Sequence, residues 1–157
     1  MMTLSNNEIT LDSSIVISLL KKDIFSQDII KVVEIIKDFE IQVYISHIVY
    51  AEIWVGVIAS KTPKEDEIQV NKNLYELFRA EVTDLNITIS RSAAAAFLEY
   101  KNLKGTREHL IPDFLIGAHA LYYTKSILTT NPRDFFNYIP NLNVLTPTEL
   151  IEKFSPS

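Results

Sequence analysis

The sequence predicts an α/β domain, a three-layer sandwich in which a mainly parallel central sheet of four to five strands carries helices on both faces. Short β-branched and aromatic runs alternate with longer segments whose apolar residues recur at helical spacing. Strands separated by helices of this length favour parallel pairing, because each helix returns the chain across a face of the sheet. The 157 residues, 47% hydrophobic and 22% charged, fit one globular domain.

The first part of the chain predicts two strands, each followed by a helix start. Residues 9–11 suit a short strand, and Asp12-Ser13-Ser14 has the residue types that cap the next helix. Apolar residues three and four apart predict a helix over 27–39, and the β-branched run 41–45 predicts the second strand. Ser46 is expected to cap the helix that follows.

The same alternation continues to the end of the chain. The polar segment 61–66 contains a proline and predicts a loop, after which helical spacing extends from Glu65 to Val82. Pro112 suits the first turn of a helix, where its missing N–H is tolerated. Further strands are predicted over 85–89, 127–130 and 143–145, and further helices over 90–103, 112–123 and 147–154.

Composition narrows the function classes. The absence of cysteine excludes disulfides and thiolate metal sites, so any metal must have oxygen or imidazole ligands. Residues 1–10 lack an apolar signal-peptide core, and the apolar runs are too short to span a bilayer, so we expect a soluble cytoplasmic protein without a membrane partner. The net charge of −5 argues against extended, non-specific nucleic-acid binding but permits a local site where a divalent cation offsets the acids.

Four oxygen-bearing side chains are expected at one edge of the sheet. Asp12 follows the first strand, Asn131 follows a later strand, Glu52 lies in the helix that leaves the second strand, and Asp113 begins a helix. In parallel sheets, the carboxyl ends of the strands and the amino ends of the following helices face the same edge, where functional groups gather. Taken alone, Asp113 is better explained as a helix cap, because Asp is among the commonest residues at helix starts; the positions of the other acids favour a site.

Converging acids imply a cation. Two carboxylates about 4 Å apart repel by about 4 kcal/mol at the dielectric of a protein surface, whereas a capping bond contributes only about 1 kcal/mol. If Asp12, Glu52 and Asp113 meet, either one is protonated or a cation lies among them. Oxygen ligands suit Mg²⁺ or Mn²⁺, and such an ion supports phosphodiester hydrolysis.

These residues also carry a family resemblance. The chain resembles PIN-domain ribonucleases, most of all the VapC toxins of bacterial and archaeal toxin–antitoxin pairs. Four segments match the family motifs in order and spacing, and together they cover nearly the whole chain: Leu-Asp-Ser-Ser at 11–14, Ser-His-Ile-Val-Tyr-Ala-Glu-Ile-Trp-Val-Gly at 46–56, Pro-Asp-Phe-Leu-Ile-Gly-Ala-His-Ala-Leu at 112–121, and Leu-Thr-Thr-Asn-Pro-Arg-Asp-Phe at 128–135. The resemblance implies a PIN-like fold over 1–157, with residues 1–7 as an extra N-terminal tail.

The resemblance implies roles for individual residues. Asp12, Glu52 and Asp113 become metal ligands or orient metal-bound water in a Mg²⁺- or Mn²⁺-dependent endoribonuclease. Asn131 matches a fourth catalytic position that is often Asp and sometimes Asn, and the neutral amide removes one negative charge. Asp134, one helical turn further on, is an alternative for that role, or else caps the short segment that follows. Threonine 129 or 130 is a candidate hydrogen-bond donor to the acids.

The same resemblance implies partners. It predicts an RNA substrate, a homodimer, and a cognate antitoxin whose tail occupies the acidic pocket. Arg133 and the cluster of Lys101, Lys104 and Arg107 are candidates for contact with substrate phosphate, although such a cluster is also typical of a solvated surface. The histidines at 47, 109 and 119 lack ligand spacing and are expected to be structural or on the surface.

Two other functions are compatible with this reading of the chain. A catalytically inactive binding module with the same fold would explain an asparagine at position 131. A phosphotransfer domain would also place an acid after its first strand. The Asp12-Ser13-Ser14 segment, however, lacks the second acid that haloacid-dehalogenase-like phosphatases carry two residues after the first.

Overall fold

In the computed structural model, which describes residues 4–103, 105–106, 111–135 and 139–155, the chain forms a five-stranded sheet of order β3-β2-β1-β4-β5. Every pair of neighbouring strands is parallel, which confirms the predicted fold class. The strands are β1 (Glu8–Leu11), β2 (Gln42–Ser46), β3 (Glu81–Thr83), β4 (Ser126–Leu128) and β5 (Asn143–Leu145).

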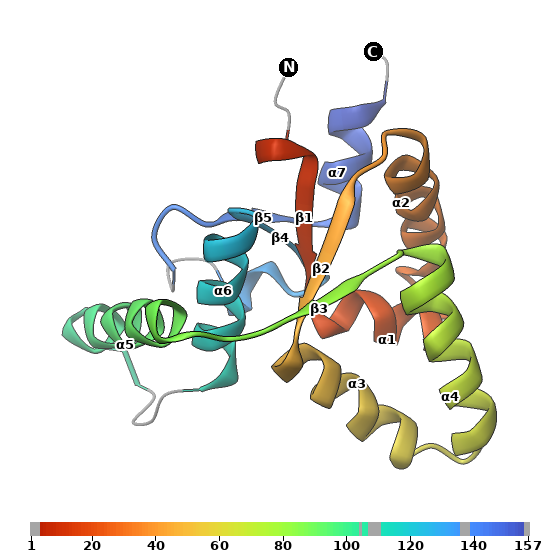
Figure 1. Cartoon of the computed structure of the whole chain (residues 1–157), viewed down its shortest axis with the longest axis horizontal. Helices are drawn as coiled ribbons and strands as arrows, with labels where there is room; N and C mark the ends of the chain where they lie inside the picture. Colours follow the sequence, from red (N-terminus) through yellow and green to blue (C-terminus); the bar gives the residue numbers. More distant parts are fainter. Residues whose placement is uncertain (1–3, 104, 107–110, 136–138, 156–157) are drawn as a thin grey trace.

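Helices cover the sheet on both faces. They are α1 (Ser13–Lys21), α2 (Ser26–Asp38), α3 (His47–Ile58), α4 (Pro63–Asn71), α5 (Ile87–Asn102), α6 (Pro112–Tyr123) and α7 (Pro147–Phe154). In Figure 1, α5 and α6 lie on one side of the strands, α1, α2 and α4 lie on the other side, and α7 packs beside α2. Shorter helical turns are η1 (Ser5–Asn7), η2 (Lys72–Leu77) and η3 (Pro132–Asp134).

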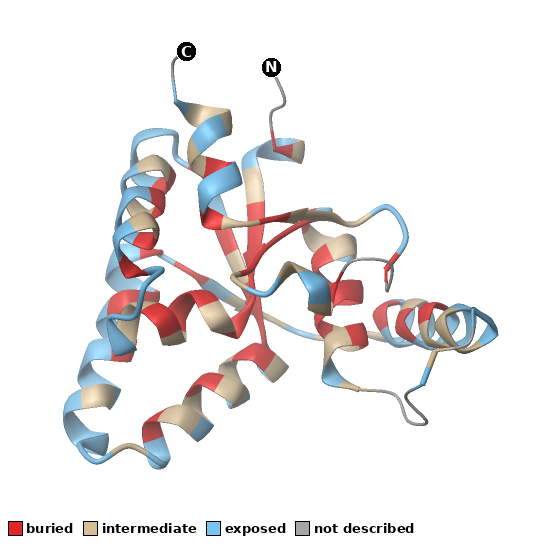
Figure 2. Cartoon of the chain, turned by 180° about the vertical axis from the view of Figure 1, so that it is seen from behind, coloured by how far each residue is buried: buried red, intermediate tan, exposed pale blue. Residues whose placement is uncertain are grey.

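The central strands form the main hydrophobic core. Ile9 and Leu11 of β1, Val43 of β2 and Ile127 of β4 are completely buried, and Figure 2 shows buried residues along these strands and the inner faces of the helices. Burial of such side chains contributes about 1.5–3 kcal/mol each. Leu4, ahead of β1, is also buried in this core. A second cluster, which includes Phe114, joins α5 to α6.

The direction of the strand order changes between β1 and β4. From β1 the chain adds β2 and β3 on one side, and it then returns to add β4 and β5 on the other side. Leu11 pairs with Leu128, and the Asp12 N–H donates to the Leu128 carbonyl at 2.9 Å, so the pairing extends one residue past β1. In parallel sheets such a switch point opens a crevice at the carboxyl ends of the strands. Asp12, directly after β1, and Thr129, directly after β4, lie at this crevice.

Three predicted elements were wrong in the middle of the chain. The predicted loop 61–66 already contains the start of α4, because Pro63 occupies the first helical turn. The helix does not continue to Val82: after η2 the chain reverses at Arg79, whose φ is 50°, and residues 81–83 form β3. The predicted strand 85–89 is instead the start of α5, because the Asn86 side chain accepts a 2.8 Å hydrogen bond from the Ile89 N–H and caps that helix.

Candidate active site

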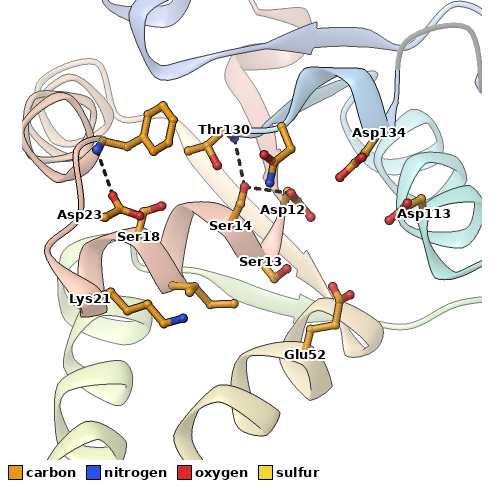
Figure 3. Close-up of a pocket in the computed structure, with 13 residues that line it drawn as sticks. Asp12, Ser13, Ser14, Ser18, Lys21, Asp23, Glu52, Asp113, Thr130 and Asp134 are labelled. Carbon is orange, nitrogen blue, oxygen red and sulfur yellow. Dashed lines mark hydrogen bonds between the residues drawn. The ribbon is translucent and has the colours of Figure 1, made fainter. Parts of the chain in front are cut away.

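A cavity of about 380 Å³ opens at the carboxyl ends of β1 and β4. The four residues predicted from the sequence, Asp12, Glu52, Asp113 and Asn131, all line it, and so does Asp134. Figure 3 shows their side chains arriving from different parts of the chain: the end of β1, α3, the start of α6, and the segment after β4. The cavity is therefore built at the switch point of the sheet, by residues far apart in sequence.

Asp12 is the most buried of these acids, at 6% exposure. It occupies the N-cap position of α1, but its side chain makes no capping hydrogen bond. Its Oδ2 atom instead accepts two hydroxyl hydrogen bonds, from Ser14 Oγ at 2.9 Å and from Thr129 Oγ1 at 2.8 Å. Burial raises the pKa of Asp12 above its ordinary value, and these hydroxyl donors partly offset that effect.

The hydroxyl donors to Asp12 are themselves held by the loop after β4. Thr130 N–H donates to Ser14 Oγ at 3.0 Å, and Asn131 N–H donates to Thr129 Oγ1 at 3.0 Å. Thr129 is thus the one of the two neighbouring threonines that contacts an acid through its hydroxyl. The network ties the start of α1 to the segment that carries Asn131, so the carboxylate of Asp12 has a fixed orientation.

Glu52 enters the cavity from α3. Ser46 at the end of β2 caps this helix, accepting a 3.1 Å hydrogen bond from the Val49 N–H, and so directs α3 along the cavity. Burial raises the pKa of Glu52; a hydrogen bond from the Ser13 side chain lowers it, and the charges of Asp12 and Asp134 raise it. Glu52 Oε1 is buried, and no described residue donates to it. A buried carboxylate oxygen without a donor favours a cation or a proton nearby.

Asp113 and Asn131 lie at the beginnings of helical segments. Asp113 is the second residue of α6, whereas Ile111 occupies the N-cap position, so Asp113 is not the N-cap residue of this helix. Its negative charge in the first turn is still favourable to the helix. Asn131 precedes Pro132 at the N-cap position of η3, and its side chain makes no capping hydrogen bond. Both side chains face the cavity.

The sequence of the chain identifies its family. A model of the PIN domain family matches residues 9–140, most of the chain. The chain belongs to the PIN domain family. No curated protein matches its sequence.

Solved structures with the fold of this PIN domain come from several bacteria. A chain of VapBC2 from Rickettsia felis, bound to a DNA fragment from its promoter, aligns with a TM-score of 0.74 and 24% identity over 88% of this chain and 98% of the other. The DNA-bound VapBC of Salmonella typhimurium aligns with a TM-score of 0.71 and 20% identity, covering 89% and 98%. FitAcB of Neisseria gonorrhoeae aligns with a TM-score of 0.66 and 21% identity, over 89% of this chain and 98% of the other. The PIN domain therefore has the fold of a VapC-type chain.

The donor set of the PIN domain cavity fits a hydrated divalent ion. Its candidate ligands are carboxylate and amide oxygens, which suit Mg²⁺ or Mn²⁺. Within the described ranges, no three acid or imidazole groups are close enough as placed to bind one ion together. Because Mg²⁺ retains several waters and takes only one or two carboxylates directly, such an ion still fits this arrangement. Glu52 Oε1, to which none of the described residues donates, is the atom that such an ion would satisfy.

Of the predicted phosphate-binding cations, the two that the structure describes, Lys101 and Arg133, do not line the cavity. Lys101 lies near the end of α5, where its Nζ donates to the Gly105 carbonyl at 3.3 Å, and Arg133 lies in η3 without lining the cavity. Lys104, Arg107 and His109 fall outside the described residues. A different cation, Lys21 at the end of α1, does line it. Helical spacing contained this signal, because positions 14, 18 and 21 lie on one face of the helix that follows Asp12.

Two histidines of the PIN domain lie away from the cavity. His119 is completely buried in α6, and its Nε2 lies 2.7 Å from Thr83 Oγ1. His47, at the start of α3, pairs through Nε2 with Asp84 Oδ1 at 2.7 Å. Neither residue lines the cavity. In the parts of the chain that the structure describes, no helix is both long and apolar enough to cross a membrane.

Proposed function

We propose that this PIN domain is a metal-dependent endoribonuclease, the toxin of a toxin–antitoxin pair. The observation that carries the proposal is the shared cavity: three acids from β1, α3 and α6 line one depression at the switch point, together with Asn131. Membership of the PIN family and the VapC-type fold support the same activity. Several carboxylates close together in a partly buried site repel one another and destabilise the fold, and a bound cation offsets that repulsion.

The residues of the chain have distinct roles in this proposal. Asp12, Glu52 and Asp113 would hold Mg²⁺ or Mn²⁺. When bound, such an ion supplies an activated water and neutralises charge on a phosphoryl oxygen. The hydroxyls of Ser14 and Thr129 favour the ionised form of Asp12 and fix its direction, because both donate to its Oδ2.

Asn131 and Asp134 are two candidates for the fourth site residue. Asn131 provides a neutral amide whose N–H donates a hydrogen bond to a substrate phosphate, or whose oxygen is a weak metal ligand. Asp134 provides a negative charge, which raises the pKa of both Asp12 and Glu52 and is therefore electrostatically coupled to them. Comparing cleavage by Asn131→Ala and Asp134→Ala variants assigns the role, because only the residue that serves the site reduces kcat strongly.

RNA cleavage by the purified chain tests the proposal. We expect cleavage with Mg²⁺ or Mn²⁺, loss of cleavage with EDTA, and a loss of at least a hundredfold in Asp113→Asn. Asp66→Asn is the matched control, because Asp66 lies in the first turn of α4 and does not line the cavity. Equal cleavage by the wild type, the EDTA sample and Asp113→Asn would identify a contaminant and overturn the assignment.

A catalytically inactive PIN module is the second candidate, favoured by the neutral Asn131 where an acid is the commoner residue. The two candidates differ in metal binding. An ion at one hundred times its dissociation constant stabilises the folded state by about 2.7 kcal/mol. The nuclease therefore predicts a rise in melting temperature with Mg²⁺ or Mn²⁺ that is lost in Asp12→Ala. No metal-dependent rise in the wild type would favour the inactive module.

The partners of the PIN domain are proposed on the same basis. The solved structures similar to it are VapBC and FitAB assemblies, so we infer a cognate antitoxin whose tail enters the acidic cavity, and a homodimer of the toxin. Co-expression with the product of a small neighbouring gene tests the first inference: a stable complex should form and RNA cleavage should stop. Light scattering of the isolated chain tests the second, because a monomer at all concentrations would exclude the dimer.

A further inference from the structure

The cavity has two chemically different ends. One end carries the acids described above, and the other end is formed by the end of α1 and the turn to α2, where Lys21 and Phe25 line it together with Ser18 and a further acid, Asp23. Among the described residues of the cavity wall, Lys21 has the only positive charge, against the carboxylates of five residues. Figure 3 shows its side chain extended along α1, with the amino group directed toward the side of Glu52.

The geometry of α1 sets the separation of the two ends. Ser14, which donates to Asp12, and Lys21 lie seven positions apart on one face of this helix. At a rise of 1.5 Å per residue the two positions are about 10 Å apart along the axis. The start and the end of α1 therefore contribute to different parts of the cavity wall.

The charge of Lys21 is available to a ligand. Lys21 forms no ion pair with any described residue. Asp23, the nearest acid in sequence, uses its Oδ1 to accept a 2.9 Å hydrogen bond from the Phe25 N–H, and its carbonyl accepts a 2.8 Å hydrogen bond from Ser26 Oγ. These bonds stabilise the turn between α1 and α2. The position of Phe25 at the cavity wall is thus built into the backbone of this turn.

Phe25 provides an aromatic surface on the same cavity wall as Lys21. It precedes α2, is 36% exposed, and lines the same cavity as Lys21. Proteins bind single-stranded nucleic acids with aromatic rings that stack on bases and cations that bind phosphates, and this cavity wall holds one residue of each kind. An acid-only cavity would offer neither contact.

We propose that Lys21 and Phe25 form a nucleotide subsite for single-stranded RNA, in which Lys21 binds a phosphate adjacent to the one at the acids and Phe25 stacks on a base. This inference rests on the proposed nuclease function and specifies how its substrate is positioned. Lys21 also lies in the last turn of α1, where a cation stabilises the helix end. That structural contribution changes stability slightly, and it does not depend on RNA.

Binding of a fluorescent single-stranded RNA oligonucleotide, measured by anisotropy in EDTA and with Mg²⁺, tests the subsite. We expect Lys21→Ala to weaken binding at least fivefold and to reduce the salt slope by about 0.7, the value of one phosphate contact on a single strand. Lys21→Arg should retain both. Lys31→Ala is the matched control, because Lys31 is an exposed cation of α2 that does not line the cavity. Phe25→Leu should weaken binding about fivefold or more, and Phe25→Tyr should retain it.

The outcomes separate this inference from the proposed activity. In cleavage assays, Lys21→Ala should raise KM and leave kcat within about twofold, since the residue holds a neighbouring phosphate. If the wild type binds RNA through Lys21 but does not cleave it with any metal, the subsite is supported and the nuclease proposal is refuted. Unchanged affinity and salt slope in Lys21→Ala would overturn the subsite while cleavage stands. Failure of the wild type to bind RNA in either condition would also overturn the subsite.

Discussion

Thr129 Oγ1 donates a 2.8 Å hydrogen bond to Asp12 Oδ2, so the residue that follows β4 holds the carboxylate that follows β1. The two positions are 117 residues apart in sequence and adjacent in the sheet, because β1 and β4 are parallel neighbours. Both residues are buried. A hydrogen bond to a buried carboxylate is worth about 1.5–3 kcal/mol, more than one between neutral groups.

Replacing Thr129 by valine should therefore destabilise the chain at neutral pH. The variant preserves the shape of the side chain and removes the hydroxyl that donates to Asp12 and accepts from the Asn131 N–H. We expect the free energy of unfolding to fall by about 2 kcal/mol at pH 7, and the pKa of Asp12 to rise further. Urea unfolding and NMR titration of Asp12 measure these effects. Thr129→Ser retains the hydroxyl and should behave much more like the wild type; equal loss in both variants would contradict this account.

The acids could be anticipated from sequence for a topological reason. Once strands and helices alternate, residues such as Asp12 and Asn131 that follow parallel strands must reach one edge of the sheet. That Thr129 would be the donor to Asp12 depends on the register between β1 and β4, which periodicity does not specify. The sequence therefore offered two threonines as candidates.

The errors have equally local causes. The segment 87–89, Ile-Thr-Ile, has strong strand propensity, but a helix starts there because the Asn86 side chain accepts a hydrogen bond from the Ile89 N–H and caps it. Lys21 was overlooked because sequence clustering favoured Lys101 and its neighbours as phosphate ligands. Its position in the cavity wall depends on the direction of α1, and the composition of a helix does not reveal which residues its end approaches.

His119 should make the chain less stable in mild acid. The residue is completely buried, its Nδ1 has no partner among the described residues, and burial lowers its pKa from 6.5 to about 4. Between about pH 4 and pH 6.5, therefore, His119 is protonated in the unfolded chain and neutral in the folded chain. The free energy of unfolding is therefore unaffected by this proton above pH 6.5. It decreases as the pH falls toward 4, by up to about 3 kcal/mol. His119→Gln, measured by urea unfolding from pH 7 to 4, should flatten this slope.

Asp12 and Glu52 act in the opposite direction and must be separated from His119. Burial raises both of their pKa values, so the folded chain binds protons that the unfolded chain has released, and their ionisation reduces stability as the pH rises through the folded pKa. The pH dependence of Asp12→Asn without metal isolates the Asp12 contribution. The double variant Asp12→Asn/His119→Gln is compared with Asp12→Asn alone. If stability falls equally steeply with decreasing pH in both, the assignment to His119 is wrong.

Two helical glycines should respond to alanine with opposite signs. A Cβ at Gly117 in α6 would lie 2.5 Å from Ile139 Cγ1, whereas a Cβ at Gly56 in α3 would meet nothing within 4 Å. Gly117→Ala must therefore displace a buried side chain, which costs about 1–3 kcal/mol and exceeds the gain in helix propensity. Gly56→Ala makes no such contact and should stabilise the chain by up to about 1 kcal/mol, because alanine is the better helix former. Urea unfolding of both variants at pH 7 measures the difference. Stabilisation by Gly117→Ala would show that α6 does not pack against Ile139 as closely as its small residues indicate, and would remove the close contact that holds the Asp113 helix in place.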